Sequence, residues 1–232
     1  MDRKSHIDLF GIVALTLFSL NLGFNQVVIK FANGGFQPVF MAGLRSAGAL
    51  VLLGLWMWAR GVPLRLPAIG RTGGIIAGLL FAVEFMCLFW ALDLTTVARA
   101  SIVFYSMPVW LALAAHVLLP GERLTALRGV GLVLAMAGVV VALADRGSGP
   151  GNLLGDLMAL GAALCWAGIA LCVRVTDLSR IPAEQQLFWQ LLVSAPVLIV
   201  VAPAFGPQVR DLAALVIRWC SSPALVVCSG SG

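Results

Sequence analysis

The sequence predicts an all-α fold, a polytopic bundle of about seven transmembrane helices followed by a tail. Of its 232 residues, 61% are hydrophobic and only 11% are charged, and the mean hydropathy is +1.02; a soluble globular protein has about 25% charged residues. The hydrophobic residues fall into runs of about 20, the length a helix needs to cross a hydrocarbon core of about 30 Å. Short connections containing glycine or proline separate most of these runs.

Two adjacent runs define the pattern most clearly. Residues Ala100 to Gly121 contain no Asp, Glu, Lys or Arg for 22 residues, and Gly129 to Ala144 contain none for 16. A polar turn, Pro120 to Arg123, joins them. This arrangement is typical of a transmembrane helical hairpin.

The same reasoning places every span in chain order. The first follows a charged start but has no small-residue cleavage site, so we expect a retained span rather than a removed signal peptide. Turn-forming residues or loop charges bound the others. The expected spans are 9 to 30, 36 to 59, 72 to 92, 98 to 119, 125 to 144, 153 to 173 and 185 to 205.

The distribution of charges argues for a membrane orientation and against nucleic-acid binding. The 15 Lys and Arg residues are scattered singly between apolar runs, so they form no basic binding face. If the N-terminus lies inside, nine of the Lys and Arg residues up to the seventh span lie in inner segments and three lie in outer loops. This excess of positive charge inside favours a cytoplasmic N-terminus. The inner residues are Arg3, Lys4, Arg60, Arg65, Arg71, Arg123, Arg128, Arg174 and Arg180, and the outer ones are Lys30, Arg99 and Arg146.

No feature of the sequence indicates a cofactor, a metal or a catalytic centre. The five cysteines have no CxxC spacing, and neither an HExxH pair nor a GxxxxGK[ST] motif occurs. His6 and His116 are the only histidines, and we interpret His116 as an interfacial or packed side chain. We therefore expect neither an intramembrane enzyme nor an ATP-driven pump.

The hairpin resembles the end of an EamA domain, the repeat unit of the drug/metabolite transporter superfamily. Small residues and Pro108 open its first helix, a Gly121-Glu122-Arg123-Leu124 turn follows, and Gly131 and Gly138 lie seven apart in its second helix. The resemblance covers roughly residues 9 to 205. Further segments that resemble the family are Ser19 to Lys30, Pro38 to Arg45 and Cys165 to Ala167.

A faint internal repeat accompanies this resemblance. Aligning Leu9 to Gly11 with Leu153 to Gly155, an offset of 144, also places Lys30 on Arg174. Five spans separate the copies, and an odd number inverts the second copy, as in many secondary transporters. We therefore expect a cytoplasmic N-terminus at 1–8, a first EamA repeat of five helices at 9–146, a partial second repeat of two helices at 147–205 and an atypical tail at 206–232.

Ionisable side chains inside spans are expensive and are site hypotheses by default. Arg45 lies about 14 Å from the outer end of the second span, and Glu84 about 12 Å from the outer end of the third. They can therefore meet at one level. As a functional pair, Arg45 would hold an anionic group of a substrate and Glu84 a cation or a coupling proton; the alternative is an ion pair that only orients two helices.

Uncharged polar and aromatic side chains extend this hypothesis. Asn21 and Asn25 share one face of the first span, and Ser101 and Tyr105 repeat that spacing on the fourth, which indicates an outward vestibule. Interhelical hydrogen bonding is the alternative for each pair. Trp166 lies deep in the sixth span and either walls the substrate path or packs.

The resemblance implies a small-molecule permease or exporter of a bacterial inner membrane, working by alternating access without a cofactor. Its substrate is not defined by the sequence, and a non-transporting membrane scaffold or fragment is the alternative. Three closing spans of the family pattern are missing after residue 205, which indicates a premature stop, a shifted frame or a natural short form. We expect the chain alone to be unstable and inactive unless it assembles with a second copy or a complementing chain.

Overall fold

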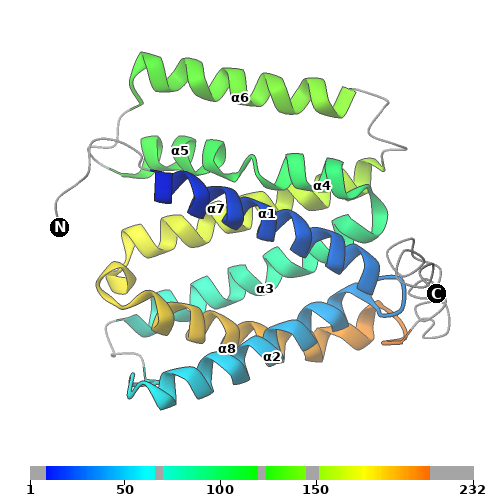
Figure 1. Cartoon of the computed structure of the whole chain (residues 1–232), viewed down its shortest axis with the longest axis vertical. Helices are drawn as coiled ribbons and strands as arrows, with labels where there is room; N and C mark the ends of the chain where they lie inside the picture. Colours follow the sequence, from blue (N-terminus) through cyan, green and yellow to red (C-terminus); the bar gives the residue numbers. More distant parts are fainter. Residues whose placement is uncertain (1–8, 66–69, 120–123, 145–151, 210–232) are drawn as a thin grey trace, which may run out of the picture.

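The fold is a bundle of roughly aligned helices (Figure 1). The computed structural model describes residues 9–65, 70–119, 124–144 and 152–209. The expected N-terminal segment 1–8, the turn at 120–123, the loop holding Arg146 and most of the tail, 210–232, lie outside the described residues.

The described helices follow the expected spans closely. Six are long and apolar enough to cross a membrane, with α4 and α5 together forming the fourth span, and α6 has a shorter apolar stretch, Ala126–Val141. The prediction of a polytopic all-α bundle is confirmed. The α-helices are α1 Leu9–Ala32, α2 Pro38–Ala59, α3 Arg71–Leu94, α4 Val97–Phe104, α5 Met107–Leu118, α6 Ala126–Ala144, α7 Leu153–Val175 and α8 Ala183–Val201, with 3-10 turns η3 Asp177–Arg180 and η4 Ala202–Phe205.

Polar side chains define several helix starts. The Gln37 side chain accepts a hydrogen bond from the backbone N–H of Phe40 at 2.6 Å, and Pro38 occupies the first helical position, where its missing N–H costs nothing. Thr96 and Asn152 cap α4 and α7 in the same way. These caps lie at one end of the bundle, where they fix the connections into three spans.

The fourth span is broken, which differs from the single helix predicted for 98 to 119. Helix α4 ends at Phe104 and α5 begins at Met107, with Pro108 in the first turn of α5. A proline has no N–H to donate to the preceding turn and its ring clashes with that turn, which kinks or breaks a helix, and here the helix is broken. The Ser106 hydroxyl donates to the Val103 carbonyl at 2.6 Å and accepts from the Trp110 indole N–H at 3.0 Å, which partly satisfies the polar groups at the break.

Helix α3 is the centre of the bundle, because α2, α7 and α8 all pack against it. Small residues allow these close approaches: a Cβ at Gly78 would lie 2.5 Å from Cβ of Val193 on α8, and one at Gly155 would lie 2.9 Å from Cβ of Thr95. The core cluster around α3 includes the fully buried Phe89 and Leu92.

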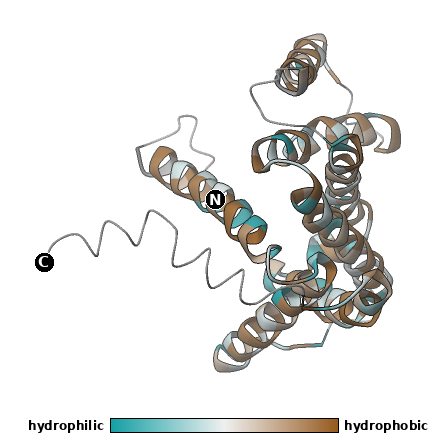
Figure 2. Ribbon diagram, turned by 90° about the vertical axis from the view of Figure 1, so that its right-hand side faces the viewer, coloured by the Kyte–Doolittle hydropathy of each residue, from teal (hydrophilic) through white to brown (hydrophobic). Residues whose placement is uncertain are grey.

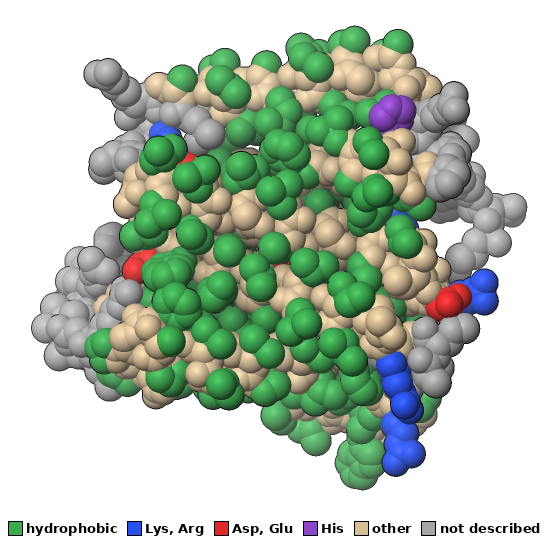
Figure 3. Space-filling model, turned by 180° about the vertical axis from the view of Figure 1, so that it is seen from behind, with side chains coloured by type: hydrophobic (Ala, Val, Ile, Leu, Met, Phe, Trp, Pro, Cys, Tyr) green, Lys and Arg blue, Asp and Glu red, His purple; other side chains and the backbone are tan. Residues whose placement is uncertain are grey.

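Helices α1 and α6 lie at the periphery. In Figure 2 each stands apart from the main body of helices, and most of their described side chains are exposed. The broad face in Figure 3 is covered by hydrophobic side chains, whereas the charged ones gather near its two edges. This distribution is the one a bilayer requires of a protein that crosses it.

Candidate functional site

Glu84 places a carboxyl group inside the bundle, near the middle of α3. Glu84 is only 4% exposed, and its Oε2 has no hydrogen-bond partner in the described part of the chain. An unpaired carboxylate is costly within a membrane, where such groups usually face a cavity, a partner charge or a transported ion. Glu84 is therefore the strongest single indication of a site.

Arg45 approaches the same level from α2. Its guanidinium carbon lies 4.6 Å from the centroid of the Phe85 ring, the immediate neighbour of Glu84. The charges of Arg45 and Glu84 interact electrostatically, but no ion pair within 4.0 Å joins them in the described structure. Arg45 is exposed whereas Glu84 is buried, so the arginine is available to a group outside the helix pair while it rests on an aromatic face.

Sequence reasoning missed several buried polar residues on α2 and α8. Ser46, next to Arg45, is 1% exposed, and its Oγ has no hydrogen-bond partner among the described residues. On α8, which packs against α2 and α3, Gln190 and Ser194 are both buried. Their i, i+4 spacing inside an apolar run was a visible signal.

Two of the predicted residues meet at the break in the fourth span. The Tyr105 ring lies 6.4 Å from the Trp166 ring, edge to face, and Phe104 stacks on Trp166 with centroids 4.9 Å apart. Phe85 belongs to the same hydrophobic cluster, so the packed core connects this region to the Arg45 side of α3. A broken helix in the membrane is a common place for a transporter's binding site.

The other predicted residues stand further apart. Asn21 is exposed and Asn25 half-buried on the peripheral helix α1, while Ser101 is half-buried on α4. No hydrogen bond or ring contact joins Asn21 or Asn25 to the other predicted site residues within the described ranges.

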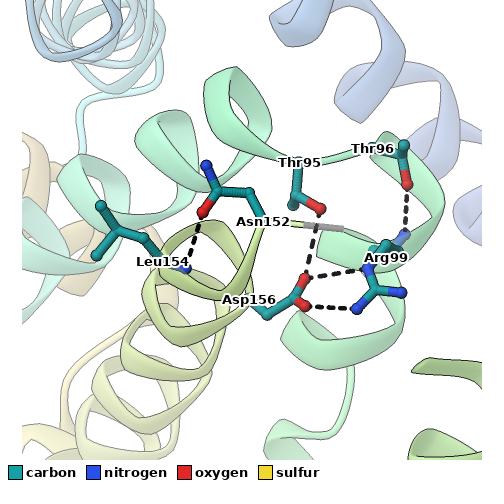
Figure 4. Close-up of polar contacts among 6 residues, drawn as sticks. All are labelled: Thr95, Thr96, Arg99, Asn152, Leu154 and Asp156. Atoms are coloured by element: carbon teal, nitrogen blue, oxygen red, sulfur yellow. Dashed lines mark hydrogen bonds and ion pairs between the residues drawn. The ribbon is translucent and has the colours of Figure 1, made fainter. Parts of the chain in front are cut away.

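An ion pair that the sequence did not predict closes one end of the bundle. Nη2 of Arg99 on α4 lies 2.6 Å from Oδ2 of Asp156 on α7, and the two side chains are only 12% and 13% exposed (Figure 4). The Thr95 hydroxyl is 3.4 Å from Oδ1 of the same aspartate. Three helices, α3, α4 and α7, are thus joined through one carboxylate.

The same end is tied to α1. The Lys30 ammonium donates to the backbone carbonyls of Thr95 at 2.9 Å and Asp93 at 3.3 Å. Together with the close contact of Gly155 against Thr95, these bonds hold the ends of α1, α3, α4 and α7 together. The sequence places Lys30 and Arg99 at the outer ends of their spans but does not give their partners, because it does not show which helices are neighbours.

Comparison with known proteins finds a family and similar solved structures. The profile of the EamA-like transporter family matches residues 9–144. One of the solved structures is described as "Crystal structure of protein". Its alignment covers 84% of this chain and 71% of the other chain, with a TM-score of 0.58 and 26% sequence identity. No curated protein matches the chain.

Proposed function

Because this chain belongs to the EamA-like transporter family, we propose that it is an integral membrane permease that moves small metabolites by alternating-access secondary transport. The family match over residues 9–144 carries this proposal. It places the chain among membrane transporters of the drug/metabolite transporter superfamily. The apolar helices support the same assignment, because six of those described are long and apolar enough for a multi-pass membrane protein.

The proposed substrate path passes beside Arg45 and Glu84. A buried carboxyl group without a hydrogen-bond partner is suited to a proton or a cation, and the exposed guanidinium is suited to an anionic group. Ser101, Tyr105 and Trp166 extend this path along α4 and α7. Asn21 and Asn25 on the peripheral helix α1 remain candidates for the same path.

An inverted repeat is part of the proposal. Helices α1 and α7 would be equivalent, as would α2 and α8. The α2–α8 contact is antiparallel: Gly43 approaches Ile199, and Gly54 approaches Phe188 eleven residues further along α2. Antiparallel packing of equivalent helices is what two inverted copies require.

The proposed location is a bacterial inner membrane with the N-terminus in the cytoplasm. In this orientation the Arg99–Asp156 pair lies at the outer end, since α4 begins there. The structure would then be closed on the outside. Alternating access would require the ends of α4 and α7 to separate.

Uptake by membrane vesicles tests the proposal. Vesicles containing the protein are compared with empty vesicles for uptake of labelled amino acids, nucleotide derivatives and phosphorylated metabolites, with and without a proton gradient. When the chain is assembled with a second copy or a complementing chain, we expect saturable uptake of at least one class. Glu84→Gln should reduce this uptake at least about tenfold, since removing a charged interaction in a dry site costs about 1.4 kcal/mol or more.

Arg71→Gln is the matched control, because Arg71 is exposed at the start of α3 and far along that helix from Glu84. Uptake equal to that of empty vesicles for every class would favour the alternative, a membrane scaffold. Uptake that is unaffected by Glu84→Gln would place the path elsewhere.

A further inference from the structure

A cavity with a charged mouth lies at the end of the bundle where α5 ends, α6 begins and α7 ends. Its volume is about 430 Å³. Helices α5, α6 and α7 all contribute to its lining, which includes Pro108, Ala112, Arg128, Gly131, Leu132 and Arg174. The cavity shares no lining residue with the proposed substrate path.

Two arginines from distant parts of the sequence line this one cavity. Arg128 lies in the first turn of α6 and Arg174 in the last turn of α7. Both are exposed. Two guanidinium groups at one mouth favour an anion, and phosphate matches their planar donor geometry well. Arg174 also has another interaction within the chain, so the larger contribution is expected from Arg128.

The inner part of the cavity is apolar. Pro108 lies ten residues before the end of α5, about 15 Å along the helix, which is half the thickness of the hydrocarbon core. Between the end of α5 and the level of Pro108, the cavity is lined by aliphatic side chains and glycine. A free anion gains nothing from such a wall, whereas an acyl chain does.

The cavity can also be reached from the side. Nothing lies within 4 Å of a Cβ built at Gly129, Gly131 or Gly138, so α6 is not tightly packed against its neighbours there. Leu127 and Val133 on α6 are 83% and 69% exposed. Figures 1 and 2 show α6 as the outermost helix beside α5. A molecule of the bilayer can therefore enter between α5 and α6.

We propose that this cavity binds an anionic phospholipid, with its phosphate between Arg128 and Arg174 and an acyl chain along Pro108, Ala112 and Leu132. Basic pockets between transmembrane helices bind lipid head groups by the same chemistry. The bound lipid would fill the space between α5 and α6 and fasten α6 to the bundle. This inference does not depend on the transport proposal.

Native mass spectrometry of the purified full chain tests the site. The protein in mild detergent is titrated with palmitoyl-oleoyl phosphatidylglycerol, with the phosphatidylcholine of the same chains, and with inorganic phosphate as a competitor. We expect tighter binding of phosphatidylglycerol, and binding about fivefold weaker after Arg128→Gln, since one arginine contributes about 1 kcal/mol to such binding. Arg174→Gln should weaken it less, and Arg128→Lys should retain most of it.

Two further variants separate the cavity from general surface attraction. Arg71→Gln removes an exposed charge at the same end of the bundle and should leave binding unchanged. Ala112→Phe fills the apolar part and keeps both arginines, so it should reduce phosphatidylglycerol binding. Size-exclusion chromatography identifies any variant that misfolds. Among the folded variants, the comparison of Arg128→Gln with Arg128→Lys tests the charge.

Equal binding of the two lipids would overturn the proposal, as would full binding in the Arg128→Gln/Arg174→Gln variant. Retention by Ala112→Phe would show attraction to the surface rather than occupation of the cavity. Complete displacement of phosphatidylglycerol by inorganic phosphate would assign the site to a free anion instead.

Discussion

The carboxyl group of Glu84 is buried in a helix interface, and Arg45 is the opposite charge that acts on it from beyond ion-pair distance. If Arg45 compensates this charge, Arg45→Gln should lower the free energy of unfolding by about 1 to 3 kcal/mol, because it leaves a buried charge without compensation. Glu84→Gln should cost less, since the amide carries no charge. Thermal melting in detergent measures both effects.

The double variant Arg45→Gln/Glu84→Gln provides the control for this pair. It should be more stable than Arg45→Gln alone, because both charges are removed together. If the double variant loses as much stability as the two single variants together, the electrostatic coupling is contradicted. Arg45 would then have only its contact with Phe85.

The Arg99–Asp156 ion pair is the second prediction at the residue scale. Its short distance and low exposure predict a coupling energy above that of a surface pair. Arg99→Gln and Asp156→Asn should each lower the melting temperature, and the loss in the double variant should be less than the sum. The exposed pair Arg180–Asp177, at 3.5 Å, is the matched control and should show little coupling.

At the scale of helices, the glycines of α3 and α6 should respond oppositely to alanine. Gly78→Ala places a methyl group 2.5 Å from Val193 Cβ, so α3 and α8 must separate, at a cost of about 1 to 3 kcal/mol. Gly131→Ala meets nothing within 4 Å and should be neutral or stabilise the protein by up to about 1 kcal/mol through helix propensity. Equal effects on melting temperature would show that α3 and α8 are not packed as described.

The positions of the helices could be predicted from the sequence, but their interruptions and rotations could not. The span expected at 72 to 92 is α3, Arg71–Leu94. Pro108 is visible in the sequence, yet the hydropathy averaged over the fourth span is high and hides the break in it. The stacking of Arg45 on Phe85 rather than a short bond to Glu84 depends on how α2 and α3 are rotated, which no residue count specifies.

For the whole molecule, a cytoplasmic N-terminus is the prediction to check first. The charge count places residue 65 inside and residue 146 outside. Single cysteines at these two positions, in a variant without the natural cysteines, should differ in intact cells: the impermeant reagent should label position 146 and not position 65. The reverse pattern would contradict the orientation.

Some contacts in the candidate site depend on which helices are neighbours, and the order of spans in the sequence does not specify this. Tyr105 and Trp166 are together because α4 and α7 are neighbours, and Arg99 and Asp156 meet for the same reason. Neighbour relations between spans far apart in the chain are set by packing. Asn21 and Asn25 have a spacing that is visible in the sequence, whereas the peripheral place of α1 (Figure 2) is not.

Access of water to the level of Arg45 tests the central claim, a substrate path through the membrane, most directly. Single cysteines at Arg45, Tyr105 and Val133 are exposed to a charged thiol reagent in right-side-out and inside-out vesicles. Val133 is the control, because it lies on the exposed apolar face of α6. The account predicts that Arg45→Cys and Tyr105→Cys react from at least one side, many times faster than Val133→Cys. Reaction of all three at the same slow rate would contradict a path beside α2, α3 and α4.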